Sequence, residues 1–540
     1  MPEVSNQKLT ARAGTVGSLT AVSRVLGLAR EMVLANAFGA GAVMDAFLVA
    51  LTLPNVLRRL AGEGVLGVAF VPVLAQVKTD GGLPAMRAFL GALLGVFVPS
   101  LIFFTLLGIG FPEVLVGLFA VGFDPERARL AAEMTRIMMP CVCLISLVAL
   151  ASGALNIEGV FAVPAALPMF LNIAVVAVTL CLLPQFAVPI HGVAWAVTAG
   201  AVAQLAVLLP LLRRHGLLVR PRLDLGHPAL GTLLRRAAPA VLGVGVYQLN
   251  IVVVRTIGSF LPSGELACYG FATRLQELAL GVFAVSISVA ALPTLSEHAA
   301  RRDGPALWAT SKGALCATNF LTIPSAIGLA TLARPIVEVL FRHGAFDPES
   351  AALTTQLVQI LALAIVPIGV VRVVVPVFYA LGNTIVPLIG AFVSLFFTIV
   401  LGLVLKNTWA VLGLTLATVC AAVFQSALVV LLLPVLMRSR GLVSSGTASP
   451  PASATRPPAR AGVFIHALRC LVAVGFPAAL AHVGLPHVWP AGDVVSLAKL
   501  GWLLLLLLFV GLSYFGLAAA FAVPEVGMLG AMLRRRVRKL

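Results

Sequence analysis

The dominant pattern along the chain is a series of long apolar runs, separated by short segments that hold the charged and turn residues. A helix of about 20 apolar residues crosses the ~30 Å hydrocarbon core of a bilayer, so we interpret these runs as membrane-spanning helices. The predicted helices occupy residues 13–37, 43–72, 87–110, 131–155, 162–183, 190–212, 237–261, 266–295, 313–341, 352–380, 385–405, 409–436, 463–484 and 496–521. The pattern predicts an all-α polytopic membrane protein with about fourteen transmembrane helices.

Composition supports this fold class. Of the 540 residues, 60% are hydrophobic and only 11% are charged, and the mean hydropathy is +1.07. These values exclude a secreted, a cytosolic or a nucleic-acid-binding protein. The 34 Pro and 49 Gly predict kinked or broken helices, which membranes tolerate where neighbouring helices satisfy the freed backbone groups. The seven Cys fall in apolar runs with no CxxC pair, so we interpret them as small buried hydrophobes and predict no metal site.

The charge distribution predicts the orientation in the membrane. The net charge of +17 comes from 37 Lys and Arg against 20 Asp and Glu. With a cytoplasmic amino terminus, the loops on the same side carry most of the basic residues, for example Arg213 and Arg214. The opposite loops are acidic or nearly uncharged, as at Glu113 and Asp124. Because cytoplasmic loops are enriched in Lys and Arg, we predict that both termini are cytoplasmic.

Self-comparison of the sequence indicates an internal duplication. A shift of 221 residues aligns Gln204 of the sixth predicted helix with Gln425 of the twelfth, and Pro72 with Pro293. A six-helix unit repeated after an even number of crossings keeps its orientation in the membrane. The pattern therefore predicts two parallel six-helix lobes, which is transporter architecture, with a substrate site between the lobes.

The predicted domains follow from this repeat. They are an N-terminal lobe (1–222), a C-terminal lobe (223–437), a cytoplasmic linker (438–462), two further helices (463–521) and a basic cytoplasmic tail (522–540). The linker is rich in Ser, Pro, Ala and Arg and has little to bury, so we expect it to be disordered. The last two helices have a long apolar face, which either faces lipid or helps to form a groove for an acyl chain.

Several charged residues fall within the predicted helices or near their ends. A central Arg costs about 2.5–3.5 kcal/mol on insertion scales, so such residues normally face a bundle interior or water. Arg outnumbers Asp and Glu at these positions, which predicts an electropositive cavity and an anionic cargo. Guanidinium groups bind phosphate oxygens bidentately, and a lipid phosphate or pyrophosphate is the expected ligand. The residues concerned are Arg24, Arg30, Asp45, Arg58, Arg59, Arg255, Arg274, Glu277 and Arg372.

Other interpretations stay open at this point. Some arginines can reach lipid headgroups, and Arg30 with Glu31 or Arg274 with Glu277 can form structural ion pairs. A membrane-embedded glycosyltransferase also binds polyprenyl pyrophosphates, but the chain has no P-loop, no HExxH and no loop long enough for a catalytic domain. A drug or polysaccharide exporter and a non-transporting scaffold protein are further alternatives.

Residues 23–74, which begin SRVLGLAREMVLANAFGAG, resemble the amino-terminal signature of the MurJ (MviN) family of bacterial lipid II flippases. The segments GFATRLQEL, VLFRHGAFD and VFYALGNTIVP resemble the same family in the same order. The resemblance implies the multidrug/oligosaccharidyl-lipid/polysaccharide (MOP) exporter fold, similar to that of MATE transporters, with two extra helices beside a lipid-tail groove. It also implies a transporter, not an enzyme, that carries lipid II to the outer leaflet of the plasma membrane for peptidoglycan synthesis.

The resemblance implies a role for particular residues as well. The substrate-binding arginines carry over to Arg24, Arg30, Arg58 and Arg274. We assign gating or supporting roles to the remaining polar candidates, with Asp45 at the outer end of the second helix. These are Asp45, Asn55, Arg59, Glu63, Glu277 and Arg372.

The chain departs from the family pattern at two positions and in one helix. Thr273 and Glu31 stand where relatives often have Asp, and the seventh predicted helix has Gln248 and Asn250 but no carboxylate. The last departure leaves a sodium site in doubt, so coupling to a monovalent cation or to the membrane potential stays open. We expect no cofactor and no nucleic-acid partner. The expected partners are lipid II, the bilayer and the cell-wall synthesis machinery.

Overall fold

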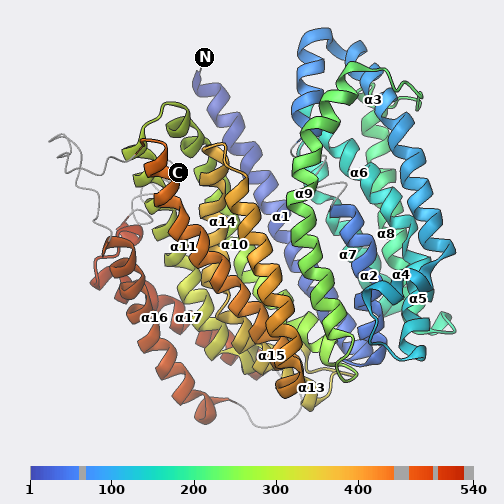
Figure 1. The fold of residues 1–540 in the computed structure, drawn as a ribbon. Helices are drawn as coiled ribbons and strands as arrows, with labels where there is room; N and C mark the ends of the chain where they lie inside the picture. Colours follow the sequence, from blue (N-terminus) through green and yellow to red (C-terminus); the bar gives the residue numbers. More distant parts are fainter. Residues whose placement is uncertain (1, 60–68, 443–460, 490–496, 528–540) are drawn as a thin grey trace. The chain divides into compact units, whose positions relative to one another are not determined.

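The computed structural model describes residues 2–59, 69–442, 461–489 and 497–527, and within these ranges it contains helices and no strand (Figure 1). The all-α fold class is confirmed. The chain divides into two compact units. Unit 1 comprises Met1–Ala267 with Gly344–Phe346, and unit 2 comprises Cys268–His343 with Asp347–Leu540.

The helices of unit 1 follow the predicted ranges with local breaks. They are α1 (Pro2–Phe38), α2 (Ala42–Arg59), α3 (Val71–Gly110), α4 (Pro112–Phe119), α5 (Pro125–Met138), α6 (Pro140–Ile157), α7 (Ala162–Cys181), α8 (Pro189–Arg214) and α9 (Pro228–Gly258). The predicted helix 131–155 is two helices, because Pro140 lacks the N–H that a continuous helix needs and instead starts α6. Residues 71 and 72, predicted to end the second helix, belong to α3, which is broken at Gly82 with φ 66°.

The core of unit 1 lies between α3, α6, α8 and α9. Phe70, Phe89, Leu155 and Leu208 are fully buried there. The segment after α8 packs against α3, and the N–H of Arg222 donates to the carbonyl of Gly91 over 2.9 Å. A basic loop predicted from charge alone is thus partly tied down by backbone hydrogen bonds.

The helices that follow are similar in character. They are α10 (Glu265–Ala300), whose first residues belong to unit 1, α11 (Gly304–Thr331), α12 (Ala333–Phe341), α13 (Pro348–Ala362), α14 (Ile365–Ala380), α15 (Ile385–Ser439), α16 (Ala461–Val488) and α17 (Leu497–Ala520). Helix α15 has non-helical backbone at Trp409 and Ala410, which separates the two helices predicted at 385–405 and 409–436. Each of the fourteen predicted ranges is overlapped by a described helix.

Many of these helices can cross a membrane. Eight are long and apolar enough by themselves, and a ninth span arises if α13 and α14, bent by 41°, are taken together. Helices α1 and α2 are not among these eight, and α1 carries Arg24, Arg30 and Glu31. The chain is therefore a multi-pass membrane protein in which some helices carry charge.

The packing units and the predicted lobes divide the chain differently. The predicted boundary at 222/223 follows the sequence repeat, whereas the packing boundary lies after Ala267, so that α9 packs with unit 1. A packing boundary does not test a repeat boundary, and the predicted lobes stay a prediction. Residues 443–460 of the predicted linker and 528–540 of the predicted tail lie outside the described residues.

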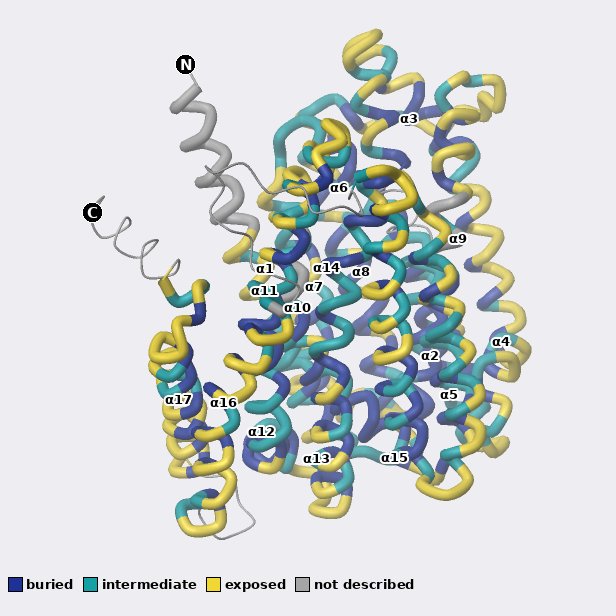
Figure 2. Tube along the Cα trace, turned by 60° about the vertical axis from the view of Figure 1, so that its left-hand side comes forward, coloured by how far each residue is buried: buried dark blue, intermediate teal, exposed yellow. Residues whose placement is uncertain are grey.

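Within unit 2, an apolar core joins α16 and α17 to α11. Phe320 of α11 packs with Cys470 and Val474 of α16 and with Tyr514 of α17. The Tyr514 hydroxyl donates to the carbonyl of Phe320 over 2.6 Å. The opposite face of the pair is exposed and apolar (Figure 2), as at Leu512, and such a surface suits lipid contact.

A buried carboxylate holds the same helices at another point. Glu338 of α12 is 5% exposed and accepts hydrogen bonds from Nε of Arg334 and Nε1 of Trp489, both over 2.9 Å. The ammonium of Lys499 in α17, itself 1% exposed, lies 3.5 Å from the second carboxylate oxygen. A buried charge is tolerated only when paired, so this cluster fixes α17 and the end of α16 against α12.

The Tyr514 hydrogen bond gives a test of how α17 is held. We expect Tyr514→Phe to lower the free energy of unfolding by about 0.5–1.5 kcal/mol, because it leaves the ring packing intact and removes one buried hydrogen bond. Thermal unfolding of the detergent-solubilised protein measures this effect. Tyr247→Phe, at a side chain that is 54% exposed, is the control and should leave the midpoint unchanged. Equal midpoints for both variants would contradict the assignment.

Candidate functional site

The two candidate arginines of α1 have different surroundings. The Arg30 side chain is 17% exposed. Its guanidinium contacts the Glu31 carboxylate at 2.5 Å and the Asn172 side-chain oxygen at 3.2 Å. Its Nε is buried and has no hydrogen-bond partner among the described residues. Arg24 is half-buried, and the structure shows no ion pair for it with a described residue. The ion pair that the sequence left open for Arg30 is present.

Asn172 is a site residue that the sequence analysis did not identify. It lies in the middle of α7, is 7% exposed, and donates from its amide to the carbonyl of Ser23 over 3.3 Å. The side-chain oxygen of Asn172 accepts from Arg30. Both the oxygen and the nitrogen of this amide therefore connect α7 to α1. An amide isolated in the apolar run around 162–181 was the available signal.

The second helix places its polar candidates at its carboxyl end. Asn55, Arg58 and Arg59 of α2 are half-buried there, after Pro54. Glu63 lies outside the described residues. The structure therefore places Arg58 and Arg59 side by side at the end of a helix, where cations are favoured by the helix dipole.

The candidates of unit 2 lie on α10 and α14. Arg274 pairs with Glu277 over 2.9 Å, with 36% and 44% of the two side chains exposed, so the pair that the sequence left open is present here too. Arg372 is half-buried, and its carbonyl accepts from the Ser288 hydroxyl over 2.7 Å. That contact joins α14 to α10 and supports the position of Arg372 in the unit.

Asp45 has surroundings that the sequence did not predict. This side chain is 1% exposed, and its two oxygens accept from the N–H groups of Gly264 and Ala267, each over 2.7 Å. The first N–H groups of a helix lack intrahelical partners, so the carboxylate caps α10. The residue predicted to gate or support transport is at least a structural anchor within unit 1.

A second cation lies near this cap. Arg127 of α5 is 3.8 Å from an Asp45 oxygen, and its side chain also hydrogen-bonds Asp124 and lies over the Phe123 ring at 5.0 Å. Hydrogen bonds from the backbone N–H and side chain of Arg127 hold the pKa of the Asp124 carboxyl below its ordinary value. Both carboxylates therefore share one guanidinium.

The turns around the cap are closely packed. Gly264 has φ +89°, and a Cβ there would lie 2.3 Å from the carbonyl oxygen of Ala40. The N–H of Ala345 donates to the carbonyl of Asn36 over 2.9 Å. His343, next to Gly344 in the sequence, lies in the turn that follows α12, and partial burial lowers its pKa. This end of unit 1 is held by several backbone contacts between distant segments.

Thr273 of α10 and Gln248 of α9, at which the chain departs from the family pattern, differ in their hydrogen bonding. The Thr273 hydroxyl donates to the carbonyl of Tyr269 over 2.7 Å, so its hydrogen-bond partner lies within α10 itself. Gln248 of α9 is 2% exposed, and its amide nitrogen has no partner among the described residues.

The fold defines a class of protein. The chain is similar to a solved structure described as the inward-facing conformation of a multidrug resistance MATE family transporter of the MOP superfamily. The TM-score is 0.66 at 15% identity, over 78% of this chain and 95% of the other. A second structure, a lipid II flippase MurJ in an inward closed conformation, matches with a TM-score of 0.76 at 22% identity, over 94% and 98% of the two chains. The fold is that of a MOP-type transporter.

The family follows from the sequence comparisons. The family model described as lipid II flippase MurJ matches residues 34–500. A lipid II flippase MurJ of Burkholderia cenocepacia is 36% identical over 372 residues, which are 68% of this chain and 72% of the relative. The chain belongs to the MurJ family, and the resemblance seen in the sequence is confirmed.

The Asp45 cap leads to a prediction about stability. Asp45→Asn keeps the shape but replaces one accepting oxygen by an NH₂ group that faces a backbone N–H, so we expect a loss of about 1–3 kcal/mol in the free energy of unfolding. Thermal unfolding in detergent measures the loss. Asp80→Asn, at an exposed carboxylate of α3, is the matched control. The cap assignment fails if Asp45→Asn unfolds together with the control.

Proposed function

We propose that this protein moves lipid II, the undecaprenyl-pyrophosphoryl disaccharide pentapeptide, from the cytoplasmic to the outer leaflet of the bacterial plasma membrane. The observation that carries the proposal is membership of the MurJ family over residues 34–500, which include most of the described helices of both units. The match to a relative named lipid II flippase MurJ spans 72% of that relative's length. The direction of transport rests on the resemblance to the family, and the cytoplasmic position of both termini rests on the distribution of basic loops.

Arg30 has the chemistry that a pyrophosphate requires. A guanidinium carries five N–H donors, and the contacts to Glu31 and Asn172 use two of them. The buried Nε donor has no protein partner among the described residues. A buried donor without a partner costs about 1–3 kcal/mol, which an anionic oxygen recovers on binding. Asn172 and Glu31 orient the group in advance, so less entropy is lost when the headgroup binds.

Arg274 and Arg24 complete the proposed cationic set. The Arg274–Glu277 pair is solvent-exposed, and such pairs contribute about 0–1 kcal/mol, so a phosphate can replace Glu277 at little cost. Arg24 is half-buried on α1. Neutralisation of these arginines by the pyrophosphate permits a conformational change that charge repulsion otherwise opposes. Arg58 is assigned to the same set by resemblance to the family.

We further propose an alternating-access cycle. Arg59 and Glu63 act at the cytoplasmic gate, Asn55 and Arg372 support the helices that move, and Asp45 acts at the outer end. The polyprenyl tail stays in lipid beside α16 and α17, whose exposed apolar face suits it. Energy comes from the membrane potential, from a monovalent cation or from the gradient of the substrate itself, since the chain has no P-loop. Contact with the cell-wall synthesis machinery is part of the same proposal.

No specific observation favours an exporter or a glycosyltransferase. The likeness to MATE transporters, at 15% identity, shows the fold alone. The family match names flippases and not enzymes. Lipid II transport is therefore the function that we test.

The first experiment expresses this chain in a bacterium whose own MurJ can be depleted. We expect wild-type protein to make lipid II accessible to an externally added cleaving reagent, and Arg24→Ala to abolish this at unchanged membrane abundance, because a central cationic ligand is lost. Arg129→Ala is the matched control, since the Arg129 side chain is 82% exposed on α5. Accessible lipid II with Arg24→Ala would sink the arginine site, whereas inaccessible lipid II with correctly inserted wild type would sink the function.

The Asn172 contact gives a graded prediction. Asn172→Ala removes a positioning residue but keeps the Arg30 charge, so we expect a partial loss of transport, about 10–100-fold by analogy with other positioning contacts. Arg30→Ala should lose more. Lipid II accessibility at matched expression measures both variants, and Asn172→Ala with wild-type activity would show that Arg30 needs no positioning.

A further inference from the structure

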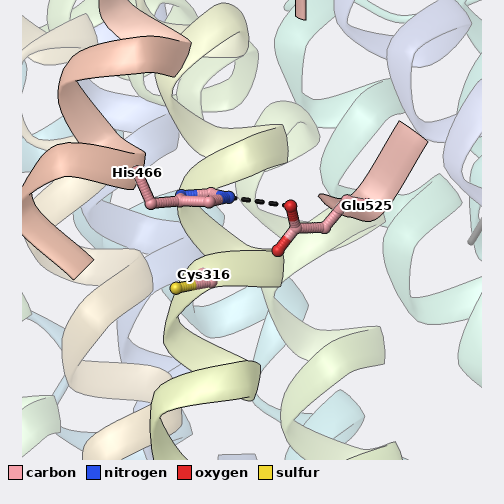
Figure 3. A group of neighbouring side chains, drawn as sticks. All are labelled: Cys316, His466 and Glu525. Carbon is pink, nitrogen blue, oxygen red and sulfur yellow. Dashed lines mark hydrogen bonds and ion pairs between the residues drawn. The ribbon is translucent and has the colours of Figure 1, made fainter. Parts of the chain in front are cut away.

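A cluster of ligand-type side chains lies in unit 2, away from the candidate arginines. Cys316 of α11, His466 of α16 and Glu525, which follows α17, each offer one atom, and these atoms lie within 4.8 Å of one another (Figure 3). His466 Nε2 is 2.8 Å from a Glu525 oxygen. Three segments that are distant in the sequence thus meet at one point.

The residue types fit a thiophilic divalent cation. Thiolate, imidazole and carboxylate are the protein ligands of Zn²⁺, with bonds of about 2.0–2.3 Å. Tetrahedral geometry at that length places ligand atoms about 3.4–3.7 Å apart. The 2.8 Å nitrogen–oxygen contact must therefore open by less than 1 Å, and the remaining separations of up to 4.8 Å must close by about 1 Å. Side-chain rotation suffices for changes of this size.

The surroundings support the same ligand. Metal-bound histidines usually hydrogen-bond through the other ring nitrogen, and here Cys470 Sγ lies 3.8 Å from His466 Nδ1. His466 and Cys470 are four residues apart on α16, hence on one helix face. His466 is 7% exposed and Cys470 is fully buried, so bulk water has little access to the imidazole.

Charge balance favours a divalent ion. One thiolate, one carboxylate and a neutral imidazole together neutralise the charge of Zn²⁺. This neutralisation lowers the free-energy cost of placing the ion in a partly buried site of low dielectric constant. Binding displaces the thiol proton of Cys316 and the second ring proton of His466, if present, to solvent.

We propose that Cys316, His466 and Glu525 bind one Zn²⁺ ion, with water as the fourth ligand and Cys470 positioning the imidazole. The ion joins α11 to α16 and to the segment after α17, and so locks the last two helices onto the rest of unit 2. This site does not depend on lipid II transport. It is a structural clamp on the helices that have the exposed apolar face.

The test uses the full-length protein, purified in detergent through a tag without histidines and stripped with a chelator. Co²⁺ replaces Zn²⁺ as a spectroscopic probe, because a thiolate–cobalt charge-transfer band reports a Cys ligand directly. We expect about one ion per chain, and Cys316→Ser should remove the band and weaken Zn²⁺ binding by at least about 100-fold. Cys181→Ser, at an exposed cysteine of α7, is the control and should bind as wild type does.

Glu525→Gln provides a second variant that keeps the thiol and the fold. It should weaken Zn²⁺ binding and keep the cobalt–thiolate band at high Co²⁺. Cys470→Ser should weaken binding by at most about 10–100-fold, as an outer-shell change does. Absence of stoichiometric binding in wild type, or a band that persists in Cys316→Ser, would overturn the proposal.

Discussion

A charged group that leaves water must find its partners inside the protein, and in this chain the partners come from distant segments. Around Asp45 lie the N–H of Gly264, just before α10, the N–H of Ala267 in the first turn of α10, and the guanidinium of Arg127. The arrangement is mutual, because the start of α10 has donors that no helical carbonyl can satisfy. Glu338 follows the same rule with Trp489 and Lys499. These contacts fix which helices lie together, whereas apolar packing between helices is far less selective.

In the proposed transport site, by contrast, not every hydrogen-bond donor of the arginines has a protein partner. Arg30 is held by Glu31 and Asn172 but keeps an unused buried donor. Complete pairing would make the guanidinium a structural group, and no pairing would leave it mobile and costly to bury. Partial pairing gives a preorganised group that still gains from an anion. The pair at Arg274 achieves the same balance by exposure, since its ion pair is weak in a solvated position.

The last two helices are joined to the rest of unit 2 by contacts of several kinds. Apolar packing and the Tyr514 hydrogen bond join α17 to α11, and the Glu338 cluster holds another part of the pair. The proposed zinc ligands lie on α11, at the start of α16 and beyond α17. Helices that face lipid on one side gain little from the hydrophobic effect on the other, so specific polar contacts are needed to hold them. A metal ion there would add strength that hydrocarbon packing lacks.

The sequence by itself determined the fold class, the approximate helix ranges and the family, because a bilayer imposes long apolar runs and charged residues stand out against them. It identified Arg30 and Asp45 as unusual for the same reason. Tertiary structure decided what those residues contact: Asn172 lies 142 positions from Arg30, and Gly264 lies 219 from Asp45. The Cys316–His466–Glu525 cluster was likewise outside sequence reasoning, since its members lie on three segments. Apolar periodicity shows that a helix is buried, but only packing brings particular side chains together.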